Sequence, residues 1–165
     1  MRLLRTTSFS VLLSVQVASL SNFLCLFCKA QERETQKEVC ANFAGVKPPP
    51  YNLVRQWHAD VHPMPILFVS VKQRHMTRDS MIALACRIGK DHSSERALDL
   101  YIFDDQHAAK VYSPAHEGNT AEVEKALRAM YEFSREKGQQ WIDLRPAPNS
   151  KWIHVDLGKA PEASE

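Results

Sequence analysis

Residues 63–71 read PMPILFVSV, and this stretch decides the fold of the chain. The run from Ile66 to Val71 is continuous, apolar and rich in β-branched side chains, and two prolines introduce it. Such a run is typical of a strand covered on both faces, whereas a half-exposed strand alternates apolar and polar residues. The sequence therefore predicts a strand in the middle of a sheet.

A helix and a second strand follow this run. Thr77 or Asp79 can cap the helix, and Gly89 provides a C-terminal stop. One face of the helix is apolar and comprises Met81, Leu84, Ala85 and Ile88. Over residues 97–103, aliphatic side chains alternate with other side chains, as in a strand that has one more apolar face. Because the links are short, we expect a parallel pair joined by a right-handed crossover.

The rest of the pattern predicts a short helix and an antiparallel meander. Residues 104–111 predict one or two helical turns capped by an aspartate, and residues 120–128 suit either a short helix or a strand. Further strands are predicted over residues 127–133, 141–144 and 152–157. We expect a two-layer α+β domain, with a sheet of about five strands and one principal helix on one face.

The first thirty residues have the layout of a secretory signal peptide. A short basic start precedes a mostly apolar stretch, and Cys28 and Ala30 supply the small residues that signal peptidase requires. The apolar stretch of about 17 residues is interrupted by polar side chains and is short for a spanning helix. We therefore expect cleavage before Gln31 and export to the periplasm or the exterior. An N-terminal anchor and a lipoprotein are the alternatives.

Cleavage changes the charge of the chain. The leader holds three basic residues and no acidic one, so 18 of the 21 basic side chains remain against all 19 acidic ones. A near-neutral domain without a basic stripe argues against a nucleic-acid partner. It also provides no electrostatic reason to bind an anionic membrane, and no stable membrane span is expected after cleavage.

Two of the four cysteines leave with the leader, and Cys40 and Cys86 remain. A bridge between them would close a loop of about 46 residues, which stabilises a fold by about 4 kcal/mol in the chain-entropy model. The alternative is that Cys86 is a small core residue on the apolar side of the helix. Neither cysteine belongs to a C-x-x-C pair, so thiol-disulfide catalysis is not expected.

The composition divides the chain into four parts. A signal peptide occupies residues 1–30, and a polar and proline-rich segment occupies residues 31–50, where Pro48-Pro49-Pro50 predicts a stiff connector. The single α+β domain covers residues 51–158. We expect the tail, residues 159–165, to be disordered.

A two-layer fold leaves one sheet face partly bare, and aromatic side chains are candidates to lie there. Such a face on an exported domain is a place for a partner or ligand. The alternative is that these side chains complete the core. The four candidates are Tyr101, Phe103, Trp141 and Trp152.

The sharpest chemical motif is HADVH at residues 58–62. In an extended segment His58, Asp60 and His62 point to one side, and two imidazoles with a carboxylate can bind a divalent transition metal. A surface strand would have the same composition. At the predicted strand end, Asp104 and Asp105 could hold a metal or act as a nucleophile, but an aspartate before a helical turn is also the commonest N-cap.

The motifs favour binding over catalysis. No nucleophile elbow, zinc spacing or glycine-rich phosphate loop occurs, so no nucleotide cofactor is expected. We interpret the chain as an exported, non-catalytic binding or protein-interaction module that uses its sheet face or the loop Ser113–Asn119 on an envelope or extracellular component. The first alternative is a small metal-dependent enzyme using His58, Asp60 and His62. The second is an accessory subunit whose bare face is covered in a complex.

Overall fold

Strand β2 (Pro65–Val71) is buried along its whole length, as the PMPILFVSV stretch predicts. The computed structural model describes residues 39–58, 64–115 and 117–163. The predicted signal peptide, residues 1–30, lies outside the described residues. All the elements below belong to one folded unit.

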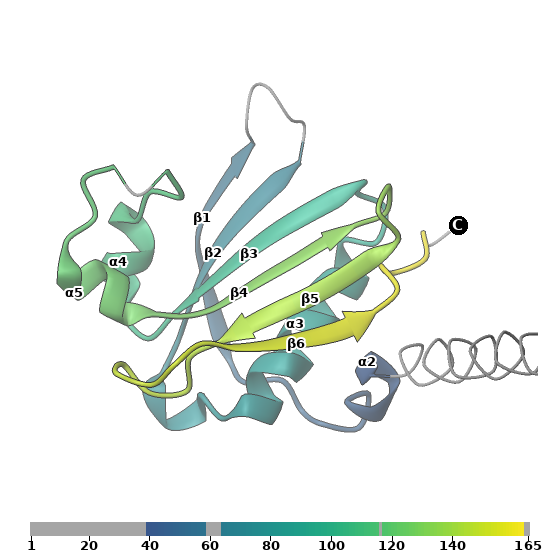
Figure 1. Ribbon diagram of the computed structural model, residues 1–165, viewed down its shortest axis with the longest axis horizontal. Coiled ribbons are helices and arrows are strands. Elements are labelled where there is room, and N and C mark those ends of the chain that lie inside the picture. The colour runs from purple at the N-terminus through teal and green to yellow at the C-terminus, as the bar shows by residue number, and fades with distance from the viewer. Residues whose placement is uncertain (1–38, 59–63, 116, 164–165) are drawn as a thin grey trace, which may run out of the picture. The chain divides into compact units, whose positions relative to one another are not determined.

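Six strands form one sheet in the order β1-β2-β3-β4-β5-β6 (Figure 1). β2 and β3 are parallel, as expected for a crossover through a helix, and every other neighbouring pair is antiparallel. The α+β class is therefore confirmed. The elements besides β2 are α2 (Val39–Asn42), β1 (Tyr51–His58), the 3₁₀ helix η1 (Gln73–His75), α3 (Arg78–Asp91), β3 (Ala97–Phe103), α4 (Gln106–Val111), α5 (Ala121–Ala126), β4 (Leu127–Ser134), β5 (Gln139–Leu144) and β6 (Ile153–Gly158).

Strand β1 is the sixth strand, which the expectation of about five did not include. It pairs antiparallel with β2 at the edge of the sheet, and its register shifts between Leu53 and Arg55. The irregularity breaks the period-two pattern by which a strand is recognised in a sequence. Arg55 anchors the strand, because its guanidinium lies 3.9 Å from the ring centroid of Phe68 and donates a hydrogen bond of 2.6 Å to the carbonyl of Tyr112.

The two faces of the sheet are covered unequally. The principal helix α3 packs on one face, and its apolar side chains join those of β2 to β6 in the larger core cluster. On the other face, a smaller cluster places α4 and α5 against residues of β2 and β3 and the start of β4. Figure 1 shows α3 behind the sheet and α4 and α5 at its left end. The described helices therefore leave part of the second face open over β4, β5 and β6.

Each of the two short helices begins at a capping side chain. Asp105 caps α4 by accepting a hydrogen bond of 2.7 Å from the amide of Ala108, so this aspartate is an N-cap. Thr120 caps α5 in the same way, and the ambiguous segment of residues 120–128 divides into this helix and the start of β4. Gly138, at a φ of 66°, lies in the turn between β4 and β5.

Helix α3 begins where Thr77 predicts but does not stop at Gly89. The Thr77 side chain accepts a hydrogen bond from the amide of Ser80, and the helix continues to Asp91. The C-terminal stop predicted at Gly89 is therefore wrong. This glycine is needed for packing, because a Cβ atom there would overlap the hydroxyl of Tyr131 and lie 3.0 Å from its Cζ.

We expect Gly89→Ala to lower the free energy of unfolding by about 1–2 kcal/mol in urea denaturation. Overpacking a tight contact costs about 1–3 kcal/mol, and the higher helix propensity of alanine offsets up to about 1 kcal/mol. Tyr131 has little freedom to move, because it is buried and its hydroxyl donates a hydrogen bond of 2.9 Å to Oε1 of Gln140.

Gly45→Ala is the matched control, because a Cβ atom at Gly45 would meet nothing within 4 Å. Its effect should stay within about 0.5 kcal/mol. In the double variant Gly89→Ala/Tyr131→Phe, the two effects should not add, since the hydroxyl that the new methyl group strikes is gone. Full additivity would contradict this account of Gly89.

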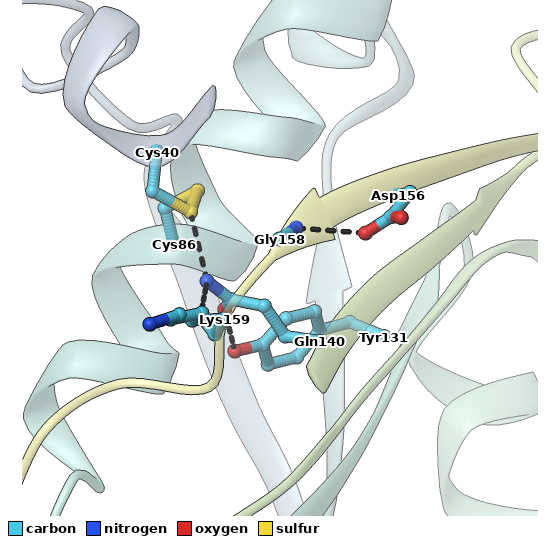
Figure 2. Close-up of a disulfide and its surroundings, with 7 residues drawn as sticks. All are labelled: Cys40, Cys86, Tyr131, Gln140, Asp156, Gly158 and Lys159. Carbon is cyan, nitrogen blue, oxygen red and sulfur yellow. Dashed lines mark hydrogen bonds between the residues drawn. A yellow bond between two sulfur atoms is a disulfide. The ribbon is translucent and has the colours of Figure 1, made fainter. Parts of the chain in front are cut away.

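A disulfide between Cys40 and Cys86 joins α2 to α3, with the two Cα atoms 5.5 Å apart (Figure 2). The predicted bridge is thus confirmed. Gln140, which is buried, lies beside it and donates hydrogen bonds to Sγ of Cys40 at 3.7 Å and to the carbonyl of Lys159 at 2.7 Å. The first residue of the tail, for which disorder was predicted, therefore has a specific partner in the core.

Candidate functional site

The open part of the second sheet face carries carboxylates around an aromatic ring. The strand registers place Asp99, Glu132, Trp141 and Asp156 in one row across β3, β4, β5 and β6. The next row is Tyr101, Met130, Asp143 and His154. Directly opposite residues in antiparallel strands have Cβ atoms about 4.5–5.5 Å apart, so neighbours within each row can interact. We call these eight residues the acidic face.

Trp141 occupies the middle of this surface. Its partners in the neighbouring strands are Glu132 in β4 and Asp156 in β6. Gln140 and Ile142, on either side of it in β5, are buried, whereas Trp141 is partly exposed. The alternation of β5 thus presents the indole on the acidic face, with a carboxylate on each side.

Burial raises the pKa of both inner carboxylates, Asp99 and Glu132. Loss of solvation raises the pKa of Asp99 to about 6, the negative charge of Glu132 adds to this shift, and Lys137 opposes it. The pKa of Glu132 is also raised by burial. Oδ1 of Asp99 is buried and has no hydrogen-bond partner among the described residues. The inner end of the row is therefore a site where an additional positive charge would be stabilising.

The outer carboxylates have partners of their own. Oδ1 of Asp143 lies 2.8 Å from Nδ1 of His154. Oδ1 of Asp156 accepts a hydrogen bond of 2.8 Å from the amide of Gly158. These contacts orient both carboxylates beside Trp141, and a shallow hollow of about 270 Å³ lies between Trp141, His154 and Asp156.

The stability of the fold should fall as the pH rises from about 4 to about 6, and Asp99 should cause part of this fall. A carboxyl whose pKa is higher in the folded than in the unfolded chain binds its proton more tightly when folded, so raising the pH favours unfolding. We expect Asp99→Asn to be the more stable protein above pH 6 by about 1–2 kcal/mol, because a shift of two pKa units corresponds to about 2.7 kcal/mol and solvent screens part of it.

Urea denaturation of both proteins at several pH values measures this difference. Glu132→Gln serves as the second variant. Removing the charge of Glu132 should lower the pKa of Asp99 and make the free energy of unfolding depend less on pH. A difference between Asp99→Asn and the parent that does not change across this pH range would contradict the prediction.

The four aromatic candidates have different environments. Trp141 and Tyr101 belong to the acidic face, and Tyr101 is stacked on Phe68 with ring centroids 5.4 Å apart. Phe103 is fully buried, with its ring centroid 5.2 Å from that of Tyr112 in an edge-on contact under α4. Its predicted place on a bare face is corrected: α4 covers it, so it completes the core. Trp152 is exposed, and the guanidinium of Arg145 lies 4.9 Å from its ring centroid.

The proposed metal ligands fall mostly outside the described residues. His58 is the last residue of β1 and is exposed, whereas Asp60 and His62 are among the residues that the structure does not describe. Within the described part of the chain, no three His, Cys, Asp or Glu side chains are grouped to hold a metal ion. The metal site at residues 58–62 stays a prediction.

The other two candidates from the sequence are Asp104 and the loop Ser113–Asn119, and both make polar contacts within the domain. Oδ2 of Asp104 lies 3.5 Å from Nε of Arg128, and burial raises the pKa of Asp104 while Arg128 opposes this shift. In the loop Ser113–Asn119, the side chain of Asn119 accepts a hydrogen bond from the amide of Ser113 and donates one to its carbonyl, both at 2.8 Å. Asn119 thus ties the two ends of the loop together.

Comparison of the chain with protein-family models, with curated proteins and with solved structures finds no match. Among the described helices, none is both long enough and apolar enough to cross a membrane.

The carboxylates of the acidic face were not among the sequence candidates. The alternation of polar and apolar residues in each strand did indicate on which side these carboxylates lie. The less buried side of its strand holds each of Asp99, Glu132, Asp143 and Asp156. Alternation shows that such side chains share a face within one strand. It does not show that four strands align them around one tryptophan, since this depends on register.

Proposed function

We propose that this chain is an exported, non-catalytic binding module that recognises a cationic segment of an envelope or extracellular protein on its acidic face. The observation that carries the proposal is the position of Trp141 between Glu132 and Asp156. A lysine or arginine side chain over an indole is attracted by the ring, and adjacent carboxylates add charge-assisted hydrogen bonds.

The electrostatics of the face support a positively charged partner. The raised pKa values of Asp99 and Glu132 reflect burial, and for Asp99 also repulsion by Glu132. A bound cation would relieve that repulsion. Trp141 suits such a ligand better than Trp152, because the ring of Trp152 already interacts with the Arg145 guanidinium.

Two features support export. The N-terminal thirty residues have the pattern of a signal peptide. The Cys40–Cys86 disulfide is of the kind that persists in oxidising compartments. Expression of the full chain in a bacterial host tests this part of the proposal, because the exported product should begin at Gln31. Retention of residues 1–30 on a cytosolic product would contradict it.

Binding is tested by titrating the protein with a lysine-rich peptide and with its glutamate-rich counterpart. Only the lysine-rich peptide should bind at about 0.1 M salt, and Trp141→Ala should weaken its binding about 5–30-fold, the equivalent of about 1–2 kcal/mol. Isothermal titration calorimetry measures both affinities.

Trp152→Ala is the matched control, because it removes an exposed indole that already has a cationic neighbour. This variant should bind the lysine-rich peptide as the parent does. Equal weakening by Trp152→Ala and Trp141→Ala, or equal binding of the glutamate-rich peptide, would sink the proposal.

A further inference from the structure

A separate crevice lies at the carboxyl ends of β2 and β3, the parallel pair of the sheet. It has a volume of about 450 Å³, and it is lined by residues at the ends of these strands and in the segments that follow them. The carboxyl ends of parallel strands commonly border ligand sites, because the chain leaves them in different directions and opens a crevice. The side chains that matter here are Ser70, Lys72, Arg74, His75, Asp104 and Gln106.

The charged wall of the crevice is positive. Lys72 and Arg74 are exposed on its rim, and Arg74 donates a hydrogen bond of 3.1 Å to Nε2 of His75. Asp104 is the only acidic residue that lines the crevice among the described residues. Its carboxylate is paired with Arg128, whose side chain is only 1% exposed. The crevice therefore presents two cations whose charge its single carboxylate does not cancel.

Ser70 adds an unused hydrogen-bonding group to the wall. The residue is only 7% exposed, yet it lines the crevice. Among the described residues no side-chain hydrogen bond occupies its hydroxyl, and this hydroxyl is not one of the buried polar atoms that lack a partner. A ligand oxygen in the crevice would accept a hydrogen bond from this hydroxyl.

We infer that the crevice binds a small molecule carrying an oxyanion, either a carboxylate or a phosphate. Arg74 and Lys72 supply the positive charge, and the Ser70 hydroxyl donates to an oxygen of the ligand. Gln106, at the start of α4, provides an amide for orientation. This site is independent of the acidic face, since its residues are different and its charge preference is the opposite.

The test is a titration of the full chain with inorganic phosphate and, separately, with succinate, followed by amide chemical shifts in NMR. One of the two should bind saturably at one site and shift residues around Ser70 and Arg74. The stronger probe identifies the anion as phosphate or carboxylate. Arg74→Gln should weaken binding at least about tenfold, because a hydrogen bond to a charged group contributes about 1.5–3 kcal/mol.

Lys110→Gln is the control, because Lys110 is an exposed lysine of α4 that does not line the crevice. It should leave anion binding unchanged. Ser70→Ala tests the hydroxyl separately and should weaken binding with little change in fold. Non-saturable shifts with both anions, or equal loss in Lys110→Gln and Arg74→Gln, would overturn the inference. Binding of the lysine-rich peptide by Arg74→Gln should stay at the parent level, so failure of one proposal is distinguishable from failure of the other.

Discussion

The variant Cys40→Ala/Cys86→Ala is expected to lose about 4 kcal/mol of unfolding free energy. The bridge joins residues 46 positions apart, so its removal restores a large amount of conformational entropy to the unfolded chain. It also frees the four-residue helix α2, which is too short to be stable without tertiary contacts. Urea denaturation at neutral pH measures the loss.

The parent protein reduced with an excess of thiol is the control for this variant. Its stability should match that of the double variant, because both lack the cross-link. The dependence of unfolding free energy on urea should also be steeper without the bridge, since the unfolded chain exposes more surface. A loss below about 1 kcal/mol would show that the loop constraint contributes little, contrary to the chain-entropy model.

Asp104→Asn should cost about 3 kcal/mol, because it leaves the charge of Arg128 buried without a counterion. The Arg128 side chain is 1% exposed and that of Asp104 is 17% exposed. Nη2 of Arg128 donates a hydrogen bond of 2.8 Å to the carbonyl of Pro146, but Nε and Nη1 have no hydrogen-bond partner among the described residues. The carboxylate of Asp104 is therefore the main compensation for this charge, and thermal or urea unfolding measures its loss.

Asp79→Asn is the matched control. Asp79 and Arg78 form an ion pair at 3.4 Å, nearly the same separation, but their side chains are 64% and 53% exposed. Exposed pairs contribute about 0–1 kcal/mol, so this change should be close to neutral. The double variant Asp104→Asn/Arg128→Met should recover part of the loss, because no unpaired charge remains. Similar effects of Asp104→Asn and Asp79→Asn would refute the argument from burial.

Most elements of the sheet could be predicted from local pattern. A few residues are enough to predict three of these features. They are the buried run of β2, the alternation of β3 and the cap of α3 at Thr77. β1 could not be predicted in this way, because it is an irregular edge strand with exposed residues at both ends. Its residue Arg55 contacts Phe68 in β2 and Tyr112, and Tyr112 lies 57 positions away in the chain.

Gly89 shows how tertiary contact overrides a local signal. A glycine near the end of an apolar helix pattern is a common stop, and here the helix continues to Asp91. What requires glycine is the close approach of α3 to Tyr131 in β4. That contact joins residues 42 positions apart, so no local pattern contains it.

The candidate site was only partly accessible from the sequence. Tyr101 and Trp141 were identified as candidates because an open sheet face with aromatic residues is a place for a partner or ligand, and both belong to the acidic face. Phe103 is also an aromatic residue and was a candidate for the same reason, but α4 covers it. The carboxylates were missed because each occupies an ordinary polar position of its own strand.

By itself, the sequence determined the α+β class and the parallel crossover, because apolar periodicity and capping residues are local properties. It also named Cys40 and Cys86 as the candidates for a bridge, and the structure decided that they are bonded. Only the tertiary structure decided which half of the second sheet face stays open and which side chains meet there. The reason is physical: strand register and the packing of α4 and α5 bring together residues from four strands, and no segment of the chain encodes that alignment alone.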